Sequence, residues 1–194
     1  SIDALHWAGS GDSVQQELRA NGLTATDDMN RKGDIGTAAH SVLEHLAEHD
    51  AVPPFTSGHD MAVISWWKAT RPEAIYTEQA IFDPDRNVAG MFDLQYGTDK
   101  TTMLDLKTGS IRRAAVIQLN IYRLGSIACG LRVPDRLAIL DTHDDGSWAE
   151  IEVPINSDWA KTAIQTNRNG KDIEKALRAA MKVARKGSAE KVAA

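Results

Sequence analysis

The sequence predicts a mixed α/β domain built around one central sheet, and two observations lead to this fold class. Apolar residues recur at helical spacing before Pro72, whereas the next three segments, up to about residue 108, alternate between apolar and polar residues. The expected order is then helices, a meander of three strands, a helix, two strands and a last helix, which is typical of a mixed α/β domain. We expect the 194 residues to form a single domain over 1–194, either with a full core throughout or with a helical appendage.

The first third of the chain is predicted to be helical. A short helix begins at the Gly-Ser-Gly of 9–11 and ends near Asn21-Gly22. A second helix covers about 30–48, where the apolar residues with helical spacing are Ile35, Ala38, Ala39, Val42, Leu43 and Leu46. After the break "AVPPF", the stretch "HDMAVISWWKATRP" forms a third helix that Pro72 stops.

Three strands follow as a meander. "EAIYTEQAIF" and "VAGMFDLQY" alternate and are separated by the turn "DPDRN", and a second turn, "GTDK", leads into "TTMLDLKT". Because strand side chains alternate between faces, Leu104 and Leu106 should face a core. Met103, Asp105 and Lys107 should then point to the other side.

The remaining elements are a helix, two strands and a basic helix. Residues 111–129 look helical, and "RLAILDT" and "SWAEIEVPI" are two strands around the turn "HDDGS". A helix over about 159–186 finishes the chain. From Trp159 to Ala194 there are nine Lys or Arg and three Asp or Glu, a balance of +6. Because the net charge of the whole chain is −5, the residues before Trp159 carry a net charge of −11. This tail fits a phosphate-binding surface or, equally, a solvated amphipathic helix.

Composition bounds the class of protein. The hydrophobic content of 42% and charged content of 25% are ordinary for a soluble globular protein. No apolar run approaches the roughly 20 residues that span a bilayer, and no signal segment opens the chain, so we expect a cytoplasmic protein without a membrane partner. Cys129 is the single cysteine, which excludes internal disulfides and a cysteine-only metal cluster.

The Asp105-Leu106-Lys107 triplet has two interpretations. It could be a solvated strand edge with a weak surface ion pair, worth at most about 1 kcal/mol. Alternatively, Asp93 on the preceding strand and Asp105 could share a cation such as Mg²⁺, since neighbouring strands lie about 5 Å apart. The cation would polarise a phosphoryl oxygen and Lys107 would steady the attacking water, a chemistry suited to phosphodiester hydrolysis. These residues alone leave both interpretations open.

Two further segments carry candidate residues. His40 lies on the second predicted helix, one turn before Glu44. A histidine in such a position is more often an ordinary structural residue of the helix face than a metal ligand. Gln118 and Tyr122 are four residues apart and therefore share one helical face. Tyr122 alone would usually be a core aromatic residue with its hydroxyl at the rim.

Taken in order, the motifs resemble those of the RecB-like branch of the PD-(D/E)XK nuclease superfamily. They are "GTAAH", "GMFD", "DLKTG" and "QLNIY", and they span about residues 33–125. The acid of "YTEQ", Glu78, sits where phage and recombination members of this branch often have one. The resemblance implies a restriction-endonuclease-like core and a metal-dependent DNA nuclease, an exonuclease or end-processing enzyme rather than an endonuclease.

The resemblance also implies roles for the matching residues. The metal ligands would be His40, Asp93, Asp105 and the backbone carbonyl of Leu106. Lys107 would activate or orient the attacking water, and Gln118 and Tyr122 would contact the substrate backbone or hold Lys107. Glu78 would be a supporting catalytic residue or a charge on an exposed strand face. The cofactor would be Mg²⁺, or Mn²⁺ because imidazole suits softer metals.

The chain departs from some relatives in lacking their four cluster-binding cysteines, so we expect no iron–sulfur cluster and a minimal member of the kind found in phage genomes. No phosphate-gripping Gly-x-x-x-x-Gly-Lys-Ser/Thr loop occurs, so any ATP-driven translocation would need a separate helicase or recombination protein. A non-cleaving nucleic-acid-binding protein of the same fold is the alternative, although a degenerate copy should have lost one of the ligands or the lysine.

DNA-contacting candidates are drawn from three places. Arg112 and Arg113 follow the Asp-x-Lys strand and could reach phosphates, or simply be solvated at a helix start. Trp66 and Trp67 could stack on single-stranded bases, although at least one of them should be core. Basic residues recur along the last predicted helix and could follow a DNA backbone: Lys171, Lys175, Arg178, Lys182 and Arg185.

Overall fold

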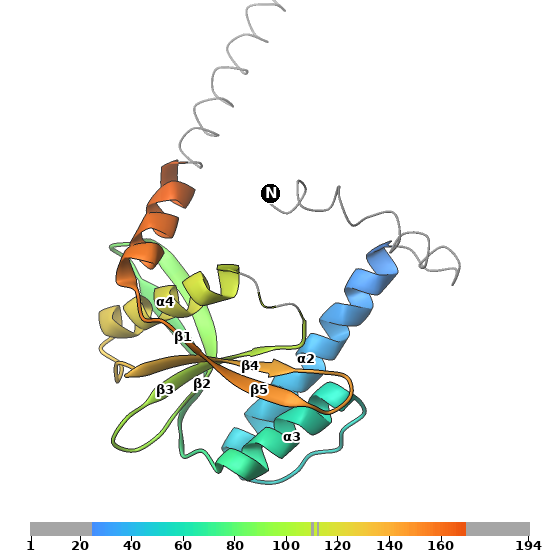
Figure 1. The fold of residues 1–194 in the computed structure, drawn as a ribbon. Helices are drawn as coiled ribbons and strands as arrows, with labels where there is room; N and C mark the ends of the chain where they lie inside the picture. The colour runs from blue at the N-terminus through green and yellow to red at the C-terminus, as the bar shows by residue number, and fades with distance from the viewer. Residues whose placement is uncertain (1–24, 110, 112, 170–194) are drawn as a thin grey trace, which may run out of the picture. The chain divides into compact units, whose positions relative to one another are not determined.

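The computed structural model describes residues 25–109, 111 and 113–169 (Figure 1). In this part of the chain the elements are α2 (Ala25–His49), α3 (Gly58–Thr70), β1 (Ala74–Asp83), β2 (Val88–Tyr96), β3 (Thr102–Lys107), α4 (Arg113–Ala128), β4 (Arg136–Thr142) and β5 (Trp148–Val153). A further helix runs over 157–169. The short helix predicted near 9–21 and the last helix beyond residue 169 lie outside the described residues.

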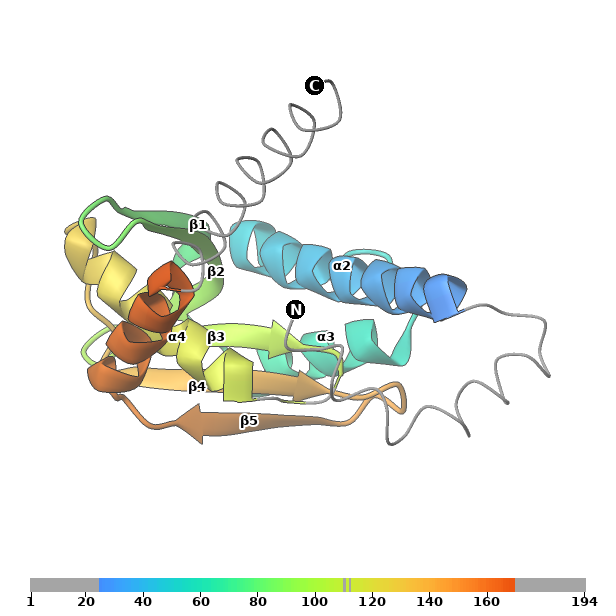
Figure 2. The same ribbon diagram turned by 90° about the horizontal axis from the view of Figure 1, so that it is seen from above.

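The strands form one five-stranded sheet in the order β1-β2-β3-β4-β5. β1 pairs antiparallel with β2, and β2 pairs antiparallel with β3, which is the predicted meander. Figure 2 shows β3 and β4 pointing the same way and β5 pointing the opposite way, so the sheet is mixed. The predicted fold class, a mixed α/β fold with one central sheet, is confirmed.

The chain divides into two compact units that share strands of this sheet. The first unit lies within 25–72, 106–109 and 140–150, and thus holds α2, α3 and the last residues of β3 and β4. The second lies within 73–105, 111, 113–139 and 151–169, and holds β1, β2, α4 and the helix over 157–169. Each unit has its own buried apolar residues.

In the first unit α2 and α3 pack against each other. Buried residues of α2 recur at three- and four-residue spacing, as predicted: Ala39, Val42, Leu43 and Leu46. α3 begins with a capping box, in which Ser57 accepts from the backbone N–H of Asp60 and Asp60 accepts from that of Ser57. It ends at Thr70, and its C-cap residue, Arg71, adopts a left-handed backbone conformation just before Pro72.

In the second unit α4 covers β1 and β2. The core beneath it is a cluster of apolar side chains: Ile81, Phe92, Met103, Ala115, Leu119, Leu137, Ile139 and Val153. Gly90 of β2 allows α4 to approach the sheet closely, because a Cβ atom at this position would lie 2.5 Å from Cε1 of Tyr122. Nothing larger than glycine fits there without displacing the tyrosine ring.

Leu104 and Leu106 face a core as predicted, and the other face of β3 is buried as well. Met103 belongs to the core under α4, and Leu104 and Leu106 are also fully buried. The reason is the position of β3 in the middle of the sheet, where both faces of a strand are covered. Asp105 is only 2% exposed, which rules out the interpretation of this strand as a solvated edge.

Among the described residues, no helix is both long enough and apolar enough to cross a membrane.

Candidate functional site

Two carboxylates of the second unit lie close together on neighbouring strands. Glu78 of β1 and Asp93 of β2 are bracketed by the paired residues Thr77↔Leu94 and Gln79↔Phe92. A carboxylate oxygen of Glu78 and one of Asp93 lie within 4.8 Å of each other. Two oxygens bound to one cation at about 2.0–2.6 Å are separated by at most about 5 Å, so this pair has the chemistry and spacing of a divalent metal site.

Glu78 reaches this position through an unusual backbone conformation. Its φ is 43°, which is a left-handed value that side chains other than glycine rarely adopt in a strand. Tyr76 and Ile81, on either side of it, both contact the core under α4 although they are five residues apart. Regular alternation would place them on opposite faces, so the strand changes face across Glu78. Strained residues of this kind concentrate at functional sites.

Asp105 continues the acidic group onto β3. The pairing of β2 with β3 ends at Leu94↔Leu104, and Asp93 and Asp105 are the next residues on the two strands. Both carboxylates are buried, Asp93 to 7% exposure and Asp105 to 2%. Glu78, Asp93 and Asp105 therefore lie on three consecutive strands of the sheet. Glu78 was expected to be a supporting catalytic residue or a charge on an exposed strand face, and its closeness to Asp93 was not foreseen.

The end of β3 is anchored inside the first unit. Leu106 is fully buried, and Lys107, the last residue of the strand, is half-buried. The hydroxyl of Thr142 at the end of β4 donates to the Lys107 carbonyl over 3.1 Å. The same hydroxyl lies 3.1 Å from Nδ1 of His59, in the first turn of α3. Because a hydroxyl has a single proton, Thr142 accepts from His59, which assigns the ring proton to Nδ1.

His40 lies on the α2 face that meets the residue after Lys107. A Cβ atom at Gly36 would lie 3.5 Å from Oγ1 of Thr108, so α2 and the end of the "DLKTG" motif touch within the first unit. His40 follows Gly36 by one helical turn and shares its face. The side chain of His40 is half-buried. Two of the four sequence motifs, "GTAAH" and "DLKTG", are thus brought together.

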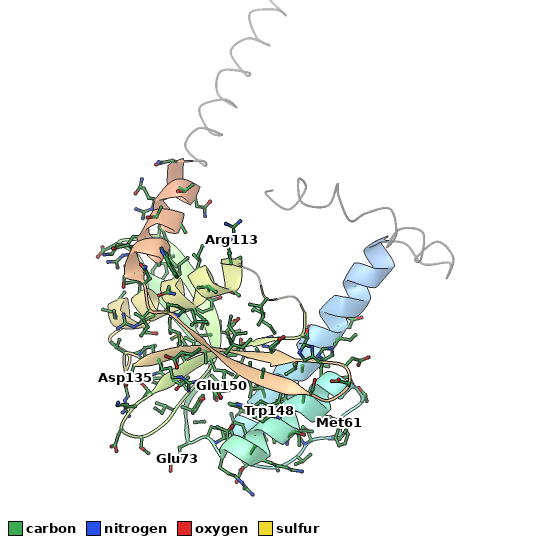
Figure 3. The ribbon with its side chains drawn as sticks, in the orientation of Figure 1. Met61, Glu73, Arg113, Asp135, Trp148 and Glu150 are labelled. Carbon is green, nitrogen blue, oxygen red and sulfur yellow. The ribbon has the colours of Figure 1, made fainter. Side chains whose placement is uncertain are left out.

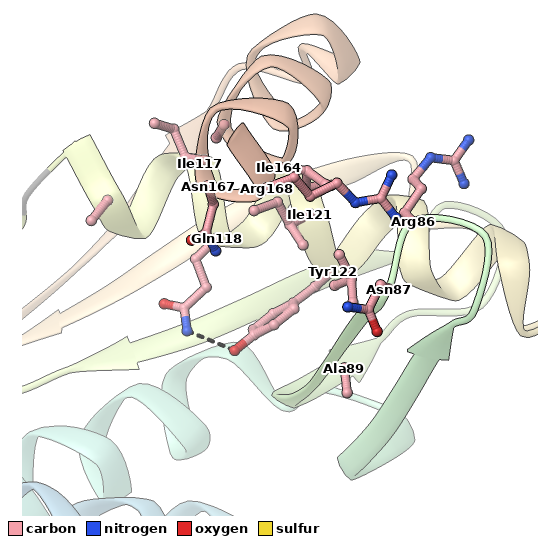
Figure 4. A pocket seen from close by; sticks show the side chains of 13 residues that line it. Arg86, Asn87, Ala89, Ile117, Gln118, Ile121, Tyr122, Ile164, Asn167 and Arg168 are labelled. Carbon is pink, nitrogen blue, oxygen red and sulfur yellow. Dashed lines mark hydrogen bonds between the residues drawn. The ribbon is translucent and has the colours of Figure 1, made fainter. Parts of the chain in front are cut away.

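Gln118 and Tyr122 of α4 share a helical face, as predicted. Nε2 of Gln118 donates to the Tyr122 hydroxyl over 2.6 Å (Figure 4). The tyrosine ring is in turn held against Gly90 of β2. The pair therefore belongs to the second unit, over the strands that carry Glu78 and Asp93.

The candidate DNA-contacting residues differ in their exposure, and some of them lie outside the described residues. Arg113 is exposed at the start of α4 (Figure 3). The stacking role suggested for Trp66 and Trp67 is wrong, because both are buried and their ring N–H groups donate to Glu150 and Asp50. The other candidates lie outside the described residues: Arg112, Lys171, Lys175, Arg178, Lys182 and Arg185.

The sequence analysis did not single out several residues that make polar contacts in the structure. His59 and Thr142 are 83 positions apart and show no shared pattern. Arg86 was read only as part of a turn, yet its Nη1 lies 2.6 Å from the buried carboxylate of Asp83. Burial raises the pKa of Asp83, but the hydrogen bonds and positive charge of Arg86 outweigh it and hold this pKa below its ordinary value.

No protein-family model matches the chain, and no curated protein matches it. Among solved structures, the chain is similar to the crystal structure of an alkaline exonuclease (LHK-Exo) from Laribacter hongkongensis. The TM-score is 0.39 at 14% sequence identity, and the match covers 74% of this chain and 84% of that chain.

Proposed function

We propose that the chain is a divalent-metal-dependent deoxyribonuclease of the RecB-like PD-(D/E)XK type that hydrolyses phosphodiester bonds at DNA ends. The observation that carries the proposal is the carboxylate pair of Glu78 and Asp93 within 4.8 Å, with Asp105 next to Asp93 on the adjoining strand. Buried acids are rare unless they are paired or hold a cation. Asp93 and Asp105 are buried and Glu78 is half-buried, and three such acids on consecutive strands favour a metal centre over a structural role.

The metal ligands in this proposal are Asp93 and Asp105, joined by His40 and the backbone carbonyl of Leu106. We add Glu78 as a ligand or a direct neighbour of the metal, because its carboxylate lies close to that of Asp93. A bound Mg²⁺ or Mn²⁺ would polarise the scissile phosphate and acidify a water molecule. Carboxylate oxygens suit Mg²⁺, and an imidazole ligand makes Mn²⁺ the alternative.

The remaining residues act on the substrate. Lys107 follows Asp105 by two positions on β3, and its ammonium would orient the attacking water and stabilise charge that develops on the phosphate. The Gln118–Tyr122 pair would contact the DNA backbone. Arg113 and the basic residues of the C-terminal region would bind phosphates without reading sequence. Unwinding of duplex DNA would require a separate helicase or recombination partner.

The test is digestion of end-labelled linear, circular and single-stranded DNA with Mg²⁺, with Mn²⁺ and with EDTA. Loss of linear but not circular DNA would support end-dependent cleavage. Asp105→Asn and Asp93→Asn should abolish cleavage and weaken Mn²⁺ binding measured by calorimetry. Lys107→Ala should bind Mn²⁺ as the unmodified chain does but cleave about 10² times more slowly or worse.

The matched control is Glu73→Gln, which neutralises an exposed acid just before β1 (Figure 3). It should change neither metal binding nor cleavage. The competing function, a DNA-binding protein that does not cut, predicts DNA binding without cleavage under every metal condition. Full activity in Lys107→Ala or in Asp105→Asn would refute the assigned roles.

A further inference from the structure

A pocket of about 780 Å³ lies in the second unit beside the Gln118–Tyr122 pair (Figure 4). Its walls come from three segments: the turn between β1 and β2 with the start of β2, one face of α4, and the helix over 157–169. The volume falls within the roughly 300–1,000 Å³ of typical small-molecule sites. The pocket is therefore large enough for a ligand and is built within a single unit.

The lining combines apolar surface with carboxamide groups. Aliphatic side chains and the ring of Tyr122 form the apolar part, and carboxamides are supplied by Asn87, Gln118 and Asn167. A carboxamide both donates and accepts hydrogen bonds, which is what the edge of a nucleobase requires. The aliphatic and aromatic surfaces suit the faces of such a ring. No Asp or Glu is among the described residues that line the pocket.

Two guanidinium groups lie at the end of the pocket formed by the β1–β2 turn. Arg86 extends from this turn, and Nη2 of Arg168 donates to the backbone carbonyl of Asp85 in the same turn. Arg86 uses Nη1 on Asp83, and its side chain remains 41% exposed. A guanidinium has five N–H donors in a planar fork that matches a phosphate. This end of the pocket is thus suited to an anion.

We propose that the pocket binds one nucleotide unit, with the base between the apolar walls and the carboxamides and the phosphate at Arg86 and Arg168. The inference rests in part on the proposed function, because Gln118 and Tyr122 are assigned there to the DNA substrate. A nucleotide within a DNA strand and a free deoxynucleoside monophosphate share this chemistry. The two sources are separated by competition.

The experiment uses the full chain in EDTA, so that cleavage plays no part. Calorimetry measures binding of a deoxynucleoside monophosphate, of the same deoxynucleoside without its phosphate, and of inorganic phosphate. The monophosphate should bind at least about tenfold more tightly than either part, since each part makes only half of the contacts. Absence of monophosphate binding, or equal binding of nucleotide and nucleoside, overturns the proposal.

Two variants locate the site. Arg168→Gln should weaken monophosphate binding about tenfold or more, the scale of losing a charge-assisted hydrogen bond, and leave nucleoside binding unchanged. Ala89→Phe, at an exposed position in the pocket wall, should reduce binding of both ligands by filling the space. The matched control is Arg136→Gln, which removes a surface arginine paired with Glu152 at 3.0 Å and should change neither. Unchanged binding in both pocket variants refutes the site.

Competition with a labelled single-stranded oligonucleotide assigns the source. Displacement of the oligonucleotide by the monophosphate, lost in Ala89→Phe, would show that the pocket holds a nucleotide of the strand. Simultaneous binding would show a site for the free nucleotide. Failure of the nuclease proposal would appear separately, as absent cleavage with Mg²⁺ or Mn²⁺ while monophosphate binding in EDTA persists.

Discussion

Replacement of Thr142 by valine tests how the end of β3 is held. The valine side chain keeps the β-branched shape but removes the hydroxyl, which donates to the Lys107 carbonyl and accepts from Nδ1 of His59. His59 is 8% exposed, so its ring N–H would lose its partner away from bulk water. A buried polar group left without its hydrogen bond costs about 1–3 kcal/mol. We therefore expect Thr142→Val to lower the free energy of unfolding by that amount.

The measurement is urea unfolding followed by tryptophan fluorescence, with Thr142→Ser as the control. Serine keeps the hydroxyl and loses one buried methyl group, which costs about 1 kcal/mol. In a His59→Ala background the valine substitution should cost less, because the donor is already absent. The double-mutant cycle should give a coupling of about 1 kcal/mol.

A null coupling, or equal losses in the serine and valine variants in both backgrounds, would refute the reasoning. Because Lys107 is proposed to serve the reaction, Thr142→Val should also slow DNA cleavage more than Thr142→Ser does.

Three further predictions concern packing, pH and metal content. Gly90→Ala should destabilise the chain by about 1–3 kcal/mol in thermal unfolding, because the added Cβ would lie 2.5 Å from Tyr122, whereas Gly33→Ala, with open space around it, should not. Asp83 has a pKa held below its ordinary value, so its pairing with Arg86 contributes stability above about pH 4 that is lost as the pH falls further; Arg86→Gln should show a smaller loss of stability between about pH 5 and pH 2. Purified protein should be colourless and free of iron, because one cysteine cannot supply the four thiolates of a cluster, and stoichiometric iron with absorbance near 400 nm would contradict this.

Elements whose signal lies in a short stretch of chain were predicted closely. The stretch "VAGMFDLQY" is β2, residues Val88–Tyr96, because it combines alternation with turn residues on both sides. Helix α3 ends at Thr70, just before the predicted stop at Pro72, since the residue before a proline is pushed out of the helical region. Gln118 and Tyr122 meet because helical geometry alone places residues four apart on one face.

Tertiary structure decided what each element faces. Both tryptophans of α3 are buried and β3 is covered on both faces, because segments far away in the sequence pack against them. For the described residues, the sequence predicted the order of the elements and the chemical types of the candidate residues, since helix and strand periods and turn residues act locally. Only the tertiary structure brought the carboxylates of Glu78 and Asp93 within 4.8 Å and joined His59, Thr142 and Lys107, because strand register and the left-handed φ of Glu78 depend on the packing of the whole sheet.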